Sequence, residues 1–166
     1  MHKYHFFLLL VLSLLFSSCG STNQLSSARI DQIRVAQDGT RLIKVWGVAP
    51  NADAAISKAL RNAVEGCLFF GIDAGSTTGR IPPLCPDGVQ AYYNNRQYFD
   101  RFFAAGNHLQ YVNRVNSLYP TGEDNIRVRG GRSVGIQVQL KVNQLRQRME
   151  NDGIIKSLDN IWDTAN

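Results

Sequence analysis

Five acidic side chains offer the simplest chemistry that this sequence could perform. Asp73, Asp87, Asp100, Glu123 and Asp124 lie in the central part of the chain. Two carboxyl groups brought together, one protonated and one ionised, can act as general acid and general base in glycoside hydrolysis. Their spacing favours no particular pair, so a hydrolase is the third and least supported function. Lost activity on changing Asp73 or Asp100 would be its first sign.

Histidine chemistry depends on one residue. His2 and His5 belong to an apolar leader described below, so the rest of the chain contains only His108. Metal centres and catalytic triads need histidine together with further ligands or a nucleophile. Asp100 lies eight residues before His108, a spacing with no clear meaning, and no HExxH or paired-cysteine zinc pattern occurs. We therefore expect a non-enzymatic protein without cofactor or metal, in which His108 is structural.

A segment rich in glycine and hydroxyl groups, GIDAGSTTGR at residues 71–80, resembles the first phosphate loop of the actin and Hsp70 ATPase superfamily. In that superfamily the glycines and hydroxyls contact the nucleotide phosphates. Here the segment follows a predicted helix instead of joining two strands, and the chain is too short for two large lobes. No Gly-Lys-Ser/Thr follows at Walker spacing. We expect no nucleotide, and whether the loop over residues 71–89 binds another ligand stays open.

The start of the chain indicates export. A short polar stretch with one lysine leads into an apolar run, and two serines precede Cys19. This describes a secretory signal peptide, and the run is shorter than the roughly 20 residues of a membrane span. The serine pair and cysteine resemble the lipobox of bacterial lipoproteins, with Phe16 where that family usually has leucine. The resemblance implies a signal peptide over residues 1–18 and a lipid anchor on Cys19.

The same resemblance implies a location. Some lipoproteins are retained in the inner membrane by an aspartate after the cysteine, and others are exported to the cell surface by acidic tethers. Here Gly20 follows Cys19, and no acidic residue occurs before Asp31. The outer membrane is therefore expected, with the domain facing the periplasm. Residues 19–38, which begin rich in Ser, Thr, Asn and Gln, are expected to form a flexible tether.

The two remaining cysteines, Cys67 and Cys85, would share the oxidising periplasm. Only one intramolecular pairing is available to them, and in the chain-entropy model it would contribute about 3 kcal/mol. Cys67 also falls on the apolar face of a predicted helix, where a thiol serves as a small core residue. The sequence leaves a Cys67–Cys85 disulfide open.

Composition permits one folded domain, expected over residues 39–166. The 166-residue chain has 44% hydrophobic and 19% charged residues, enough to build a core. Its formal charge is +5, and removing Lys3 with the leader leaves 17 basic against 13 acidic residues, or +4. This small excess suits anionic headgroups, glycans or acidic proteins, and we expect no nucleic-acid partner.

Hydrophobic periodicity predicts the elements of the domain. Residues 40–49 are expected as a strand, and Asn51 caps a helix whose buried alanines indicate close packing on a sheet. Its polar face is expected to contain Ser57, Lys58, Arg61, Asn62 and Glu65. A loop over 72–89 follows. A helix is expected at 92–104, followed by strands at 109–118, 126–128 and 133–142, with a Gly130-Gly131 turn between the last two strands. A further helix is expected to start at 145–150. An apolar stripe near the end of the chain consists of Ile155, Leu158, Ile161 and Trp162.

This strand-helix-(helix)-strand-strand-helix order predicts a two-layer α+β domain, an antiparallel sheet with helices packed on one face. The segment VWGVAPNADAAISKALRNAV resembles small bacterial outer-membrane lipoproteins related to the N-terminal domain of the flagellar assembly protein FlgT. The later alternating strand followed by LRQRM is similar to the end of that domain. The resemblance implies a periplasmic structural or assembly module without catalytic residues.

Two groups of residues are candidates for a partner surface. Arg127, Arg129 and Arg132 surround the Gly-Gly turn and suit phosphate-bearing lipid or an acidic protein. Tyr92 and Tyr93 belong to an aromatic helix, and aromatic residues mark interfaces as well as cores. The leading hypothesis is a docking module of an envelope complex, for example a type VI secretion system. The alternative is a periplasmic glycan- or lipid-binding module that uses the Gly-rich loop and the aromatic helix.

Overall fold

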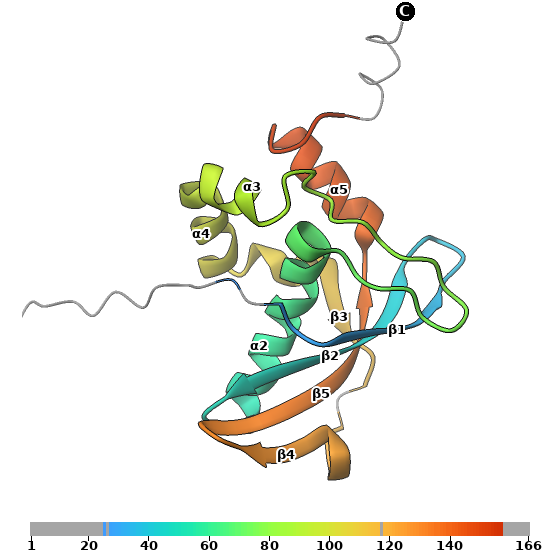
Figure 1. Cartoon of the computed structure of the whole chain (residues 1–166), viewed down its shortest axis with the longest axis vertical. Coiled ribbons are helices and arrows are strands. Elements are labelled where there is room, and N and C mark those ends of the chain that lie inside the picture. Colours follow the sequence, from blue (N-terminus) through green and yellow to red (C-terminus); the bar gives the residue numbers. More distant parts are fainter. Residues whose placement is uncertain (1–24, 26, 117, 158–166) are drawn as a thin grey trace, which may run out of the picture.

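Five antiparallel strands form one sheet in the computed structural model, which describes residue 25, residues 27–116 and residues 118–157 (Figure 1). The central strands β2 (Arg41–Ala49) and β5 (Gly131–Leu140) pair along the whole of β2. β1 (Ile30–Val35) lies on the other side of β2. β3 (Val112–Arg114) and β4 (Asn125–Val128) share the far edge of β5.

The helices pack against this sheet and confirm the predicted α+β class. α2 (Ala52–Glu65) lies against β2 and β5, and a π-helical turn, η2 (Gly66–Phe70), continues it. Figure 1 shows the other helices gathered at one end of the molecule and β4 at the opposite end. They are α3 (Val89–Asn94), α4 (Arg96–Ala104) and α5 (Val142–Asn151), with the 3-10 turn η3 (Asn107–Tyr111) beside α4. A second 3-10 turn, η4 (Gly122–Asp124), lies beside β4 and β5.

α2 and β2 approach most closely at Gly47. A Cβ atom on this residue would lie 2.1 Å from the carbonyl oxygen of Ala55 and 2.5 Å from the backbone nitrogen of Ala59. Both alanines are completely buried. The predicted cap is also present, because the Asn51 side chain accepts a hydrogen bond of 2.9 Å from the backbone N–H of Ala54. The prediction that small residues bring this helix close to the sheet is confirmed.

The Gly-rich loop packs against the edge strand β1. The Gln32 side-chain amide donates hydrogen bonds to the carbonyls of Asp73 (2.7 Å) and Gly79 (3.0 Å). A Cβ atom on Gly75 would lie 2.6 Å from the carbonyl oxygen of Gln32, so only glycine fits this approach. The small residues that resemble a phosphate loop therefore hold a loop against a strand whose edge would otherwise be free.

The predicted tether over residues 19–38 is wrong in its second half, because β1 occupies Ile30–Val35 and pairs with β2. The folded domain begins before residue 39. Only Gln32 of this strand is buried, and its polar sequence hides the alternation that identifies a strand.

Cys19, the signal peptide and residues Leu158, Ile161 and Trp162 of the apolar stripe lie outside the described residues.

Asn95 divides the helix predicted over residues 92–104 into α3 and α4. Its side-chain amide and its backbone N–H both donate to the carbonyl of Ala91, each at 3.1 Å. Asparagine competes in this way with the regular hydrogen bonds of a helix, so α3 ends here and α4 begins at the next residue.

The strand predicted over residues 109–118 is shorter than expected. Gly106, with a φ of +73°, ends α4, and a 3-10 turn follows before β3 begins at Val112. This turn places His108 and Tyr111, three residues apart, on the same buried side. The strand predicted over 133–142 runs from 131 to 140 instead, and α5 follows directly.

Replacing Gly47 by alanine tests the contact between helix and sheet. The added methyl group meets backbone atoms that no rotamer change can move, so Gly47→Ala should lower the free energy of unfolding by about 3 kcal/mol. Gly79→Ala is the matched control, because its Cβ would meet no heavy atom within 4 Å, and should change stability by less than about 0.5 kcal/mol. Urea unfolding monitored by circular dichroism measures both. Equal stability of the two variants would contradict the proposed contact.

Candidate interaction surface

The face of the sheet opposite α2 carries polar and partly exposed apolar side chains. Along β2, Ile43 and Val45 are buried under α2, and the alternate residues Lys44 and Trp46 are only partly buried. Val48, the next residue on the same face, is exposed. Strand alternation therefore creates an outer face, and the side chains on it are the ones available for interaction.

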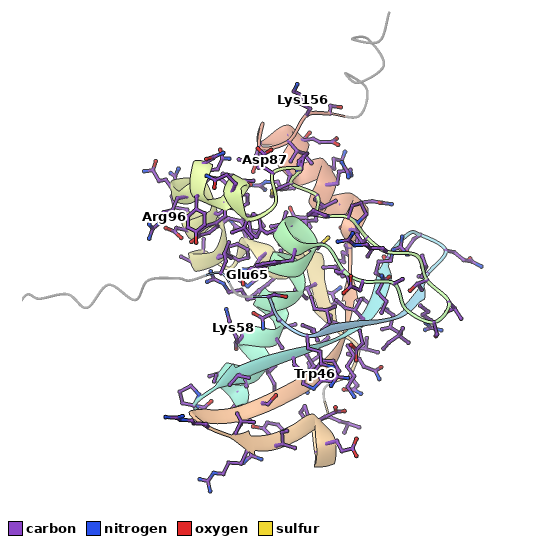
Figure 2. All side chains as sticks on the ribbon, in the orientation of Figure 1. Trp46, Lys58, Glu65, Asp87, Arg96 and Lys156 are labelled. Atoms are coloured by element: carbon purple, nitrogen blue, oxygen red, sulfur yellow. The ribbon has the colours of Figure 1, made fainter. Side chains whose placement is uncertain are left out.

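Trp46 is the centre of the outer face (Figure 2). Its indole lies across Gly135 of β5, where a Cβ atom would sit 2.7 Å from Nε1. The guanidinium carbon of Arg29 lies 4.1 Å from the centre of the ring, and the Lys44 ammonium lies 5.2 Å from it. Each cation also has an acidic partner, because Arg29 pairs with Asp31 at 2.9 Å and Lys44 pairs with Asp124 at 2.6 Å. These contacts hold the indole in one position.

A groove of about 420 Å³ lies beside Trp46. β1 pairs with β2 only as far as Val45, so the remaining residues of β2 have no strand partner on this side within the described chain. The groove runs along that open edge. Its lining comes from the chain before β1, from β2, from α2 and from the β4 end of the sheet, and comprises Ser27, Ala28, Arg29, Trp46, Val48, Lys58, Asn62, Glu123, Ile126 and Ser133.

Three arginines lie on the β4–β5 hairpin, which we call the arginine hairpin (residues 125–134). Arg127 and Arg132 face each other directly across the two strands. Arg132 donates to the side chain of Asn125 at 2.6 Å and to its carbonyl at 3.1 Å. Arg127 and Arg129 are exposed and make no hydrogen bond or ion pair with any residue that the structure describes. The predicted basic patch therefore forms.

The two tyrosines of the predicted partner surface do not join this patch. Tyr92 is 1% exposed, and its hydroxyl donates to Asp100 at 2.6 Å, so it belongs to the core and its assignment to a partner surface is wrong. Tyr93 is exposed. It lies on α3, at the end of the molecule opposite the arginine hairpin (Figure 1). The amphipathic spacing of the helix could have separated the two residues, since neighbours on a helix point in different directions.

The aromatic helix packs as a cluster of rings inside the domain. Phe69 of η2 meets Phe99 edge-on, with ring centroids 4.8 Å apart, and meets Tyr92 at 5.7 Å. Phe99, Phe102 and Phe103 are all buried. The expectation that these phenylalanines are core residues is confirmed, and the aromatic helix offers little surface to a ligand.

The structure contains no disulfide between Cys67 and Cys85, the pairing that the sequence left open. Both cysteines are free and completely buried. Burial raises the pKa of the Cys67 thiol to about 12 and that of Cys85 to about 11, so both remain protonated thiols at neutral pH. Each acts as a small apolar core residue, the alternative that the helix pattern offered for Cys67.

The candidate carboxylates lie on different elements, except Glu123 and Asp124, which are neighbours in η4. Asp73 of the Gly-rich loop lies 3.8 Å from Arg80, Asp100 of α4 accepts from Tyr92, and Asp124 of η4 pairs with Lys44. Within the described part of the chain, no group of three or more His, Cys, Asp or Glu side chains could hold a metal ion. Asp73, Asp100 and Asp124 thus each interact with a neighbouring side chain of the domain.

Sequence reasoning missed a buried charged cluster on α2 (Figure 2). Glu65 was expected on the solvent face, yet it is 1% exposed. It accepts a 2.6 Å hydrogen bond from Arg61 and lies 3.7 Å from the Lys58 ammonium. The Arg61 guanidinium in turn stacks 4.5 Å from the centre of the Phe103 ring. The polar side of α2 is covered because a second layer of helices, including α4, packs on it. The four-residue spacing of Arg61 and Glu65 was the sequence feature that could have indicated this ion pair.

His108 lies next to this cluster. It is 7% exposed, its ring is 5.2 Å from that of Phe103, and its Nδ1 is buried without a hydrogen-bond partner among the described residues. Burial, and then the positive charge of Arg61, lower the pKa of His108 to about 4. The imidazole is therefore neutral at physiological pH and has a structural role.

Comparisons of the whole chain with protein-family models, curated proteins and solved structures give no match. Among the described residues, no helix is long and apolar enough to cross a membrane. The sequence, the outer face with its groove and the arginine hairpin are therefore the features from which a function can be inferred.

The lowered pKa of His108 predicts a specific acid sensitivity. Between about pH 6.5 and pH 4 the unfolded chain binds a proton at this residue and the folded protein does not, so stability falls as the pH is lowered through this range. The loss should be about 2 kcal/mol, less than the full pKa difference implies because the ring is near the surface. In His108→Gln this part of the pH dependence should disappear. Urea unfolding at a series of pH values measures it, and parallel curves for both proteins would contradict the assignment.

Proposed function

We propose that this protein is a non-enzymatic lipoprotein of the bacterial outer membrane whose periplasmic domain is a docking module of an envelope complex. The observation that carries the proposal is the sequence that ends at Cys19, an exported leader followed by small residues and a cysteine. Three acyl chains on one cysteine give stable anchoring, whereas a single chain binds a membrane only reversibly.

The surface of the domain supports docking more than catalysis. The groove beside Trp46 offers apolar side chains to an extended segment of a partner. The backbone N–H of Trp46 already donates to Arg29 and its carbonyl accepts from Asn62, so the part of β2 that is open on the β1 side begins after Trp46. Strand addition of this kind uses main-chain hydrogen bonds for affinity and side-chain pockets for specificity. A secretion machine, for example of type VI, is one host that would use such a module.

A glycan- or lipid-binding module that uses the Gly-rich loop and the aromatic helix has weaker support. Gln32 holds the loop against β1, and the phenylalanines of the helix are buried. The residues on which that alternative relied are thus occupied within the domain. We therefore favour docking to a protein partner as the function of the periplasmic domain.

Removal of the lipid acceptor tests the anchor. Cys19→Ser should move the protein from the membrane fraction to the soluble periplasmic fraction, because the acyl chains contribute about 0.8 kcal/mol for every buried methylene group. The domain should stay folded, since Cys19 lies outside it, and Cys67→Ala in the same assay is the control that must remain in membranes. Fractionation and metabolic labelling with palmitate measure the result. A Cys19→Ser protein that still sediments with membranes and still incorporates palmitate would refute the anchor.

Isolation of the anchored protein tests docking. Mild solubilisation of membranes, followed by affinity purification, should recover one or more partners in stoichiometric amounts. Val48→Asp, which places a charge on the open edge of β2, should reduce their recovery by at least about tenfold, since a buried unpaired charge costs more than 1.4 kcal/mol. Val35→Asp, at an exposed position on β1, is the matched control. Recovery of the protein alone would contradict the docking function.

A further inference from the structure

The proposed anchor lies close to one particular end of the domain. Ser27 lines the groove together with Ile126 of β4. Ser27 is eight positions after Cys19, and eight extended residues span at most about 29 Å. If Cys19 carries lipid, as the proposed function holds, the groove and the neighbouring arginine hairpin cannot lie far from the membrane surface.

Exposed apolar side chains gather at this end. Leu118 is 77% exposed, and Tyr119 and Ile126 are each about half exposed. The loop that contains the first two is tied to β4, because the Asn125 side chain donates to the carbonyl of Pro120 at 2.9 Å. Tyrosine and aliphatic side chains are favourable in the zone between headgroups and acyl chains.

The arginine hairpin adds positive charge at the same end of the domain, with Arg127 and Arg132 on the opposite face of the sheet from Ile126 because neighbours along a strand alternate. Arg127 and Arg132 are directly opposite each other, and like charges in this position destabilise an antiparallel pair. Asp124 is already paired with Lys44, which leaves Glu123 as the nearby acidic residue without an ion pair in the described chain. An anion bound between the arginines would remove their repulsion. The folded hairpin is thus better suited to a phosphate-bearing surface than to water alone.

We propose that the arginine hairpin and the adjoining loop dock on the anionic phospholipid headgroups of the membrane that holds the anchor. Arg127, Arg129 and Arg132 contact headgroup phosphates, and Leu118 and Tyr119 enter the interface beside them. This orientation rests on the proposed function, because the Cys19 anchor brings this end to the membrane. It directs the end formed by α3, α4 and α5 away from the membrane (Figure 1).

Vesicle binding by the lipid-free protein tests this orientation. Mature-length protein, residues 19–166 with Cys19→Ser, is incubated with vesicles of phosphatidylcholine alone or of phosphatidylcholine with phosphatidylglycerol, and bound protein is measured by sedimentation. Binding should require phosphatidylglycerol and weaken as salt is added. Each arginine near an anionic surface contributes about fivefold, so Arg127→Glu with Arg129→Glu should weaken binding by at least about 25-fold.

The control changes the same charge elsewhere. Arg34→Glu with Arg101→Glu reverses two exposed arginines on β1 and α4, away from the arginine hairpin, and should reduce binding by less than about fivefold. Arg127→Gln with Arg129→Gln should fall between the two double variants. Circular dichroism confirms that each variant is folded, and the glutamine pair keeps the test valid if the glutamate pair misfolds. Equal loss in hairpin and control variants would overturn the proposal, as would binding that does not depend on phosphatidylglycerol.

An acidic protein is the other class of partner that would fit three arginines. Partner recovery that is lost in Arg127→Glu with Arg129→Glu, combined with no binding to anionic vesicles, would overturn lipid docking in favour of a protein contact. Failure of the anchor is recognised separately, by palmitate labelling of the unmodified chain. Because the vesicle assay uses protein without lipid, either proposal can fail while the other stands.

Discussion

The close contact of α2 with β2 at Gly47 is the constraint on which the rest of this structure depends. With no side chain between Gly47 and the helix backbone at Ala55 and Ala59, the helix lies directly on the central strand pair. Because α2 lies so close to the sheet, the side of the helix that faces away from the sheet can be covered by further elements. η3 packs on that side and Phe103 of α4 contacts Arg61 there, so that a second layer covers part of α2.

That second layer explains why charged residues are buried in a protein with ample apolar material. Glu65 lies beneath it, where Arg61 donates to it and stacks on Phe103 in the same place. Removing one partner of such a pair is costly, whereas the complete pair contributes little by itself. The cluster therefore specifies how the helices pack more than it stabilises them, and the neutral His108 beside it has the same role.

The sequence predicted those elements whose pattern is local. β2, α2 and β5 follow from strand alternation, helical spacing and the Asn51 cap, and the arginine patch follows from positions around one turn. β1 was missed because its pairing with β2, and not an apolar pattern, makes it a strand. The burial of Tyr92 and Glu65 depends on which surfaces α3, α4 and η3 cover, although helical spacing held a partial signal for both residues. Cys67 and Cys85 lie on neighbouring segments, because the backbone N–H of Leu84 donates to the carbonyl of Cys67, and both stay free thiols. Contacts between segments that are distant in the chain leave no periodic signal in a single sequence.

The sheet has two strand edges on the β1 side, that of β1 and that of β2 beyond Val45, and only the first is covered. The Gly-rich loop covers β1, as proteins commonly protect an edge strand, but beyond Val45 the edge of β2 stays open. The open part is short, because the chain before β1 still reaches Trp46, whose N–H donates to the carbonyl of Arg29. So short an edge can form few ladder hydrogen bonds and would bind a free peptide weakly. The proposed membrane anchor would change this balance, because confinement to one surface raises the effective concentration of partner and lipid together. Weak contacts at the same end of the domain then suffice, provided that the protein remains tethered there.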